Sequence, residues 1–529
     1  RLDVSANAFL YVFLPPLLFA GGLTVDVRRL MEDIGPVVLL AVVAVFMCTG
    51  AVGLSLWLAA GDALGATLLT CLLLGAIVAT TDTAAVLGIF RDIGAPGRLT
   101  TIVEGESLFN DAAAIALMFV LLELMTHAGE GVNVGAGLYS FAYGLIGGIF
   151  WGYLIARVYC WIIGQFRMGI VSEITLSVSL AYLTFVTAQE ANLLGVSGII
   201  AVVVAAMTFA SFGRTKLSPG AWDTLLVTWR QLEFWATSLI FVLAAMKAPK
   251  MIADGVTWAH VAGIAAVFTG ALIARAIVLW GMLPLLTISG LSQAISNSYK
   301  LVLCWGSLRG AVTVALALLV AETPGVPEDA KRFIFVIAMG YVFMTLFLSA
   351  PTLRPLMKAL KLDKLSPQER MVRNRVMALS RGRVRDQLVK VSEALGLTGH
   401  AATAGTPEDQ PETLGEMSHA DLARAGLMIA TNREAEMSLE YLRQGVVGSR
   451  IAERLRSDAG AVLDGLKATG PDGYIRAALK LQRPSRSFRL ALWLQRRFAW
   501  AGPLADEMAD RFELLIVKNL MLDELTGFA

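Results

Sequence analysis

The chain has 529 residues, of which 56% are hydrophobic and 16% are charged, and its formal net charge is +2. Soluble globular proteins are roughly 45–50% apolar and about 25% charged, so this composition excludes a disordered chain and a nucleic-acid-binding protein and argues against a water-soluble enzyme. The charges are unevenly spread: 44 of the 165 residues over 365–529 are charged, against 42 of the 364 residues before them. We therefore expect a transmembrane domain over 1–360 and a mainly helical cytoplasmic domain, regulatory or dimer-contacting, over 361–529.

Eleven stretches of the first domain are apolar and long enough to cross a bilayer as helices, which takes about 20 residues each. In chain order they are 8–26, 36–60, 64–90, 99–125, 134–164, 170–187, 193–211, 222–247, 256–286, 298–320 and 333–353. Lys and Arg favour the loops on the side of the C-terminal tail, which by the positive-inside rule places the tail in the cytoplasm. The predicted fold class is an all-α polytopic membrane protein, in a plasma or inner membrane.

The third stretch contains a polar run, Thr80, Thr81, Asp82 and Thr83, inside an apolar helix. Hydroxyl and carboxylate oxygens compete with the backbone hydrogen bonds of a helix. A transporter helix that breaks at such a run leaves backbone carbonyls free to coordinate a cation. The alternative is a kinked helix whose threonines bond to the preceding turn, and the run alone favours the two equally.

The fourth stretch carries Glu106, Ser107, Asn110 and Asp111. Ser107 and Asp111 are four residues apart and therefore share one helix face, while Glu106 and Asn110 form the adjacent stack. A carboxylate and a hydroxyl on one face are hard oxygen ligands that suit a small cation. A hydrogen-bond network between helices without an ion is the weaker interpretation, because four polar groups fall within six residues of an otherwise apolar stretch.

Two features of later stretches leave alternatives open. Gly144, Gly148 and Gly152 form a GxxxGxxxG face for close helix packing, either within the protomer or between two protomers. Arg230 and Glu233 lie three residues apart on the eighth stretch. That spacing favours a structural ion pair at least as much as a role in transport.

The tenth stretch is interrupted by Gly306, Ser307, Arg309 and Gly310. In a transporter, interrupted helices in corresponding positions of the two halves of the domain indicate a transport site between inverted repeats. In this sequence the interrupted helices are the third and the tenth stretches. Because a cation is favourable at a helix C-terminus, Arg309 is expected to neutralise carbonyl ends where the two broken helices cross.

The tail begins with an arginine-rich segment, Arg370–Arg385, that is expected to attract anionic lipid, although a solvated helix face explains it equally well. A linker is expected over 397–416 and two or three amphipathic helices over 418–470. The basic, aromatic segment 483–500 is suited to the membrane surface or to packing on the rest of the tail. The cysteines and histidines show no metal-ligand spacing, so no cofactor is expected.

Six motifs, taken together and in this order, resemble the sodium/proton exchanger branch of the cation/proton antiporter superfamily. They are LPPLLFAGGL at 14–23, TTDTAAVLGIF at 80–90, EGESLFNDAAAIAL at 104–117, ANLLGVSGIIA at 191–201, LIARAIVLW at 272–280 and WGSLRGAVTVALAL at 305–318. The resemblance covers nearly all of 8–360. It implies a thirteen-helix bundle of inverted repeats with two crossing broken helices, of which the eleven stretches are the third to thirteenth, and a homodimer.

Residue by residue, the resemblance implies that Asp111 binds either the cation or a proton, with Asn110 beside it. Asp82, Thr81 and Ser107 are implied as further Na⁺ ligands. The resemblance also implies a structural salt bridge between Glu106 and Arg275, and assigns Arg309 to the second broken helix.

The expected function is electroneutral exchange of one Na⁺, or Li⁺, for one proton by alternating access, with a role in pH homeostasis. A carboxylate that carries one proton or one monovalent cation is nearly neutral, so either form can cross a closed pathway. Exchange of K⁺ for H⁺ is the main alternative. A cation channel and an intramembrane aspartyl protease are more distant ones, because the protease would need YD and GxGD motifs that the sequence lacks.

Overall fold

The computed structural model describes the chain in segments. These are residues 9–25, 27, 30, 37, 39–93, 97–126, 134–166, 168–190, 194–213, 216–217, 221–252, 255–288, 295–360, 362, 419–443, 446–482, 486–498 and 501–528. The chain separates into two compact units, one over Arg1–Ala95 and Leu99–Leu362 and one that holds Asp363–Ala529. The predicted linker 397–416 and the segment Arg370–Arg385 lie outside the described residues.

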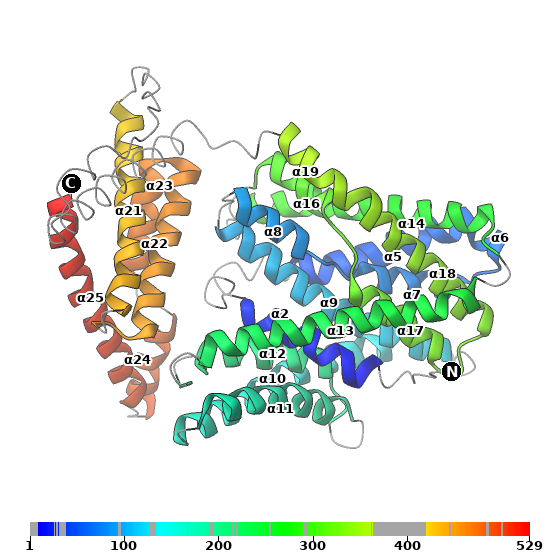
Figure 1. Cartoon of the computed structure of the whole chain (residues 1–529), viewed down its shortest axis with the longest axis horizontal. Helices are drawn as coiled ribbons and strands as arrows, with labels where there is room; N and C mark the ends of the chain where they lie inside the picture. The colour runs from blue at the N-terminus through cyan, green and yellow to red at the C-terminus, as the bar shows by residue number, and fades with distance from the viewer. Residues whose placement is uncertain are drawn as a thin grey trace, which may run out of the picture. The chain divides into compact units, whose positions relative to one another are not determined.

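The first unit is a helical bundle (Figure 1). Its helices are α2 (Leu14–Thr24), α5 (Ala44–Leu56), α6 (Asp62–Leu64), α7 (Leu68–Ala79), α8 (Ala84–Ile93), α9 (Gly97–Thr126), α10 (Val134–Gln165), α11 (Ile170–Gln189), α12 (Gly198–Phe212), α13 (Ala221–Met251), α14 (Trp258–Ala276), α15 (Leu283–Ile288), α16 (Asn297–Trp305), α17 (Ala311–Glu322), α18 (Glu328–Met344) and α19 (Ala350–Ala359). Short π-helical turns precede α2 and α5 and join α5 to α6, α14 to α15 and α18 to α19.

Seven of the described helical segments are long and apolar enough to cross a membrane, and four shorter apolar helices accompany them. Among the described residues, the β-type pairing consists of one isolated bridge between Asp82 and Leu308. The all-α polytopic fold class is therefore confirmed.

The third and tenth stretches are each broken, as predicted. The third is divided into α7 and α8 and the tenth into α16 and α17. Helix α7 ends where Thr80 turns to extended backbone and its hydroxyl donates to Ile77 O at 3.0 Å, which is the local competition expected of a threonine. Gly310, the N-cap of α17, is extended as well, and a Cβ there would overlap the Asp82 carboxylate. The close crossing of the two breaks therefore requires glycine at 310.

The glycine face of the fifth stretch packs within the protomer. A Cβ on Gly148 would lie 2.7 Å from Ser197 O, and one on Gly152 would overlap Ala201 O. These glycines let α10 approach the backbone of α12. Of the two packing alternatives left open by the sequence, the structure shows the first.

The second unit consists of α21 (His419–Arg443), α22 (Ser449–Thr469), α23 (Pro471–Gln482), α24 (Arg486–Phe498) and α25 (Gly502–Phe528). A small core holds α21, α22 and α25 together through buried side chains that include Met437, Leu455 and Met521. The amphipathic helices predicted over 418–470 are α21 and α22. The described part of the basic segment, Arg486–Phe498, is α24, and the centre of its Phe488 ring lies 4.4 Å from the Arg511 guanidinium of α25.

Candidate functional site

The two breaks lie against each other in the first unit. The Asp82 backbone N–H donates to Leu308 O at 2.9 Å, which joins the unwound segment after α7 to the one after α16. Four half-helices therefore end or begin near one point. Carbonyls at the ends of α7 and α16 and N–H groups at the starts of α8 and α17 lack helical partners there. The backbone groups at such a crossing therefore supply partial negative and partial positive charges independently of any charged side chain.

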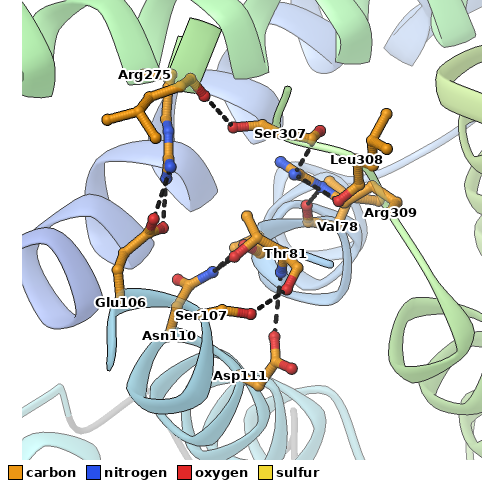
Figure 2. Close-up of polar contacts among 12 residues, drawn as sticks. Val78, Thr81, Glu106, Ser107, Asn110, Asp111, Arg275, Ser307, Leu308 and Arg309 are labelled. Atoms are coloured by element: carbon orange, nitrogen blue, oxygen red, sulfur yellow. Dashed lines mark hydrogen bonds and ion pairs between the residues drawn. The ribbon is translucent and has the colours of Figure 1, made fainter. Parts of the chain in front are cut away.

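Side chains of α9 bind the unwound segment after α7. The Ser107 hydroxyl donates to Thr81 O at 2.7 Å, and the Asn110 amide donates to Ala79 O at 2.8 Å and to the Thr81 hydroxyl at 2.9 Å. Asp111 Oδ1 accepts a hydrogen bond from Thr81 N at 3.1 Å. The spacing of these residues places them on neighbouring faces of α9, and Figure 2 shows them directed at Thr81.

The two aspartates of the site differ in surroundings. Asp111 is half-buried and lies within electrostatic range of Asp82, Glu106 and Arg309. Asp82 is exposed, and its carboxylate lies against Gly310, where α17 begins. The start of a helix carries a partial positive charge, so this position favours the Asp82 carboxylate. The structure thus brings Asp111, Asp82, Ser107 and Thr81 together around the break in α7.

Arg309 stabilises the crossing from the other side. Its Nε donates to Val78 O at 2.6 Å and its Nη1 to Ser307 O at 3.0 Å, and the residue is 3% exposed. The guanidinium also lies 5.6 Å from the centre of the Tyr341 ring, a distance that allows a cation–π interaction. Its charge therefore lies at the carbonyl ends of both α7 and the α16 segment, where a cation is favourable.

Glu106 and Arg275 form a bidentate ion pair between α9 and α14. The two N···O distances are 2.5 and 2.7 Å, and the side chains are 2% and 10% exposed. Two parallel hydrogen bonds between a guanidinium and a carboxylate fix geometry as well as charge. The Glu106 carboxylate is thereby neutralised within the bundle, so it is unsuited to bind a transported ion.

Sequence reasoning missed Thr313, whose hydroxyl lies 2.7 Å from that of Thr80. The residue is buried on α17 and joins the second half-helix to the end of the first. The signal was a lone hydroxyl in the apolar run that follows Gly310. The four cysteines are free and buried, and no cluster of three or more His, Cys, Asp or Glu that would hold a metal occurs among the described residues.

Two crossing broken helices around half-buried and buried polar groups define a secondary membrane transporter. Residues 3–359 match the family model described as the transmembrane domain of sodium/hydrogen exchangers. The chain therefore belongs to the sodium/hydrogen exchanger family. It is a multi-pass membrane protein and a transporter, so the protease alternative is wrong.

Curated relatives agree with this assignment. The chain is 33% identical to the Na⁺/H⁺ antiporter ApNhaP of Aphanothece halophytica over 372 residues, which cover 68% of this chain and 66% of the relative. It is 30% identical to the Na⁺/H⁺ antiporter NhaP of Pseudomonas aeruginosa over 68% of this chain and 82% of the relative. Sodium/hydrogen exchanger 8 of Arabidopsis thaliana is 29% identical over 76% of this chain. The matched part covers 53% of that relative, so this chain spans about half of its length.

A solved structure shares the fold. The sodium proton antiporter MjNhaP1 of Methanocaldococcus jannaschii superposes with a TM-score of 0.51 over 68% of this chain and 88% of its own, at 19% identity. The inverted-repeat antiporter bundle implied by the sequence resemblance is therefore supported as a fold.

Proposed function

We propose that the protein exchanges Na⁺ for H⁺ across the membrane, with Asp111 as the group that binds them in turn. The observation that carries the proposal is the position of Asp111 at the break in α7, beside Ser107 and with Thr81 N–H as its hydrogen-bond donor. Relatives named Na⁺/H⁺ antiporters support Na⁺ over K⁺ as the cation. Li⁺ is a further substrate to test.

The local polarity explains how one carboxylate serves two ions. The Ser107 hydroxyl oxygen, the Asp111 carboxylate, the Thr81 oxygens and the exposed Asp82 carboxylate are hard ligands within one turn of the break, as alkali cations require. A proton on Asp111 removes the charge that holds the cation, so the two ions compete. The bare carboxylate is costly to carry through a low-dielectric pathway, which opposes movement of the empty site and enforces exchange by alternating access.

We further propose that the exchange is electroneutral, one cation for one proton. Asn110 precedes Asp111 where a second carboxylate would add another titrating charge, and the Asn110 amide is held by Ala79 O and Thr81. A one-for-one exchange moves no net charge. It would not respond to the roughly 2.3 kcal/mol per charge that each 100 mV of membrane potential supplies.

The remaining assignments extend this proposal to the cell. We propose a homodimer in a plasma or inner membrane, with the C-terminal tail in the cytoplasm, anionic lipid at Arg370–Arg385 and no cofactor. Exchange of an alkali cation for protons would serve pH homeostasis. Deletion of the tail tests its regulatory role, since an unchanged pH dependence of transport would remove that role.

The test is transport by purified protein in proteoliposomes with an imposed pH gradient, with Na⁺, Li⁺ and K⁺ supplied in turn. We expect Na⁺-driven proton movement, no dependence of its rate on a valinomycin-clamped potential, and loss of exchange in Asp111→Asn. Na⁺-driven exchange that survives Asp111→Asn would contradict the role of Asp111. A rate that follows the potential would contradict electroneutrality alone.

A further inference from the structure

Glu233 lies on α13, a helix that packs alongside α17. The register of the two helices is set by the ion pair between Lys247 Nζ and Glu322 Oε1 at 2.5 Å, near the C-terminal ends of both. Ala236, Ile240 and Ala244 of α13 belong to one buried cluster with residues of α17 from Ala311 to Ala321. The two helices therefore run parallel. Each residue of α13 lies at the same height along the helix pair as the residue about 75 positions further along the chain, the separation of Lys247 and Glu322.

This register brings Glu233 to the break before α17. Glu233 precedes Ala236 by three residues and so continues the face of α13 that contacts α17. Its level corresponds to Leu308–Gly310, the segment against which Asp82 lies. The Glu233 and Asp82 carboxylates interact electrostatically, which agrees with the register. The next two side chains, Phe234 and Trp235, are 64% and 55% exposed and point elsewhere.

The ion pair suggested by the sequence is not formed. Within the described parts of the chain, the half-buried Glu233 carboxylate makes no hydrogen bond or ion pair, and exposed Arg230 acts on it only at longer range. A carboxylate inside a membrane helix is costly unless it faces a partner or a polar path. Here a second carboxylate, Asp82, lies within electrostatic range, and two like charges are compatible when a cation comes between or beside them.

We propose that Glu233 is a positioning residue of the cation path: from α13 it faces Asp82 across the break and draws a monovalent cation toward the site of Asp111. This inference rests on the proposed function. A narrow path lined by negative charge raises the local concentration of cations. Glu233 therefore affects the apparent affinity for Na⁺ and not the exchange step itself.

The experiment measures the initial rate of proton flux against Na⁺ concentration in proteoliposomes of the full-length protein. Glu233→Gln should raise the half-saturating Na⁺ concentration about three- to tenfold while the maximal rate stays within twofold. Glu233→Asp keeps the charge and should stay close to the unsubstituted protein. Asp223→Asn, an exposed carboxylate in the first turn of the same helix, is the matched control and should change neither parameter.

An unchanged half-saturating concentration in Glu233→Gln would overturn the inference, as would an equal loss of maximal rate in the Gln and Asp variants, which indicates a structural role. The proposed function is judged separately. Absence of Na⁺-driven flux in the unsubstituted protein would overturn that function and this inference together, whereas normal flux with an unaffected Gln variant would overturn the inference alone.

Discussion

Two carboxylates five residues apart on α9 have opposite surroundings. Glu106 is held by both terminal nitrogens of Arg275 and is almost fully buried. Within the described residues, Asp111 has one hydrogen-bond donor, the Thr81 backbone N–H, and it is half-buried at the break in α7. A carboxylate already neutralised by a fixed cation has no charge left for a mobile one. Pairing, and not burial alone, therefore separates the structural carboxylate from the one proposed to exchange ions.

The largest expected effect comes from breaking the Glu106–Arg275 pair. Glu106→Gln or Arg275→Gln leaves one buried charge without its partner, which costs about 3–5 kcal/mol, so yield and thermal stability should fall sharply. The double variant Glu106→Gln/Arg275→Gln should recover part of the loss. Thermal unfolding in detergent measures all three, and normal melting of both single variants would show that the pair is not structural.

The pH dependence of transport sharpens the role assigned to Asp111. In the proposed exchange one proton and one cation compete for one carboxylate, so the half-saturating Na⁺ concentration should rise as pH falls, by up to about tenfold per unit in the acidic range. The maximal rate at saturating Na⁺ should change much less. Rates measured across pH 5.5–8.5 check this, and a half-saturating concentration that is constant with pH would exclude competition.

A smaller effect is expected at the hydroxyl pair of the crossing. Thr313→Val removes the partner of Thr80, which keeps its bond to Ile77 O, so the cost should be about 0.5–1.5 kcal/mol. Thr175→Val is the control, because in the described part of the chain the Thr175 hydroxyl bonds to the preceding turn of α11. Equal melting temperatures for the two variants would show that the Thr80–Thr313 contact does not hold the half-helices together.

The smallest effect concerns the half-buried carboxylate of Glu434 in the C-terminal unit. Burial raises the pKa of Glu434 above its usual range, while Lys518 opposes and Asp458 adds to the shift. The pKa of Glu434 is thus higher in the folded state than in the unfolded state. Its contribution to the free energy of unfolding is therefore fully present at low pH and is lost as the pH rises through the folded-state pKa.

Glu434→Gln should therefore stabilise the C-terminal unit slightly at pH 7 to 8, and this gain should vanish as the pH falls below the usual glutamate pKa. Hydrogen exchange of α21 in the full-length protein measures it. A stabilisation that is the same at pH 4 and pH 8 would show that charge burial at Glu434 is not the cause.

Much of the fold was predictable because membrane helices follow simple rules of length and polarity. The fifth stretch, expected over 134–164, is α10 over Val134–Gln165. The breaks were predictable from Thr80–Thr83 and from Gly306 and Gly310, because hydroxyls and glycines weaken an apolar helix. The helices of the C-terminal unit were predictable only roughly, since amphipathic patterns do not determine which faces meet.

Less of the site was predictable. The spacing of Ser107 and Asp111 indicates one face of α9, but not that both would contact Thr81. Arg309 donates hydrogen bonds to backbone carbonyls, which no side-chain pattern in the sequence predicts. Arg230 and Glu233 show the limit most clearly: their spacing favours an ion pair, whereas in the described residues no such pair forms and Asp82 also lies within electrostatic range of Glu233.

The decisive experiment compares Asp111→Asn with Glu106→Gln, each assayed for melting temperature and for Na⁺-driven proton flux per folded molecule. Asp111→Asn should melt near the unsubstituted protein and show no flux. Glu106→Gln should melt much lower, while the fraction that stays folded still exchanges ions. Flux in Asp111→Asn, or an abolished flux in well-folded Glu106→Gln, would contradict these roles.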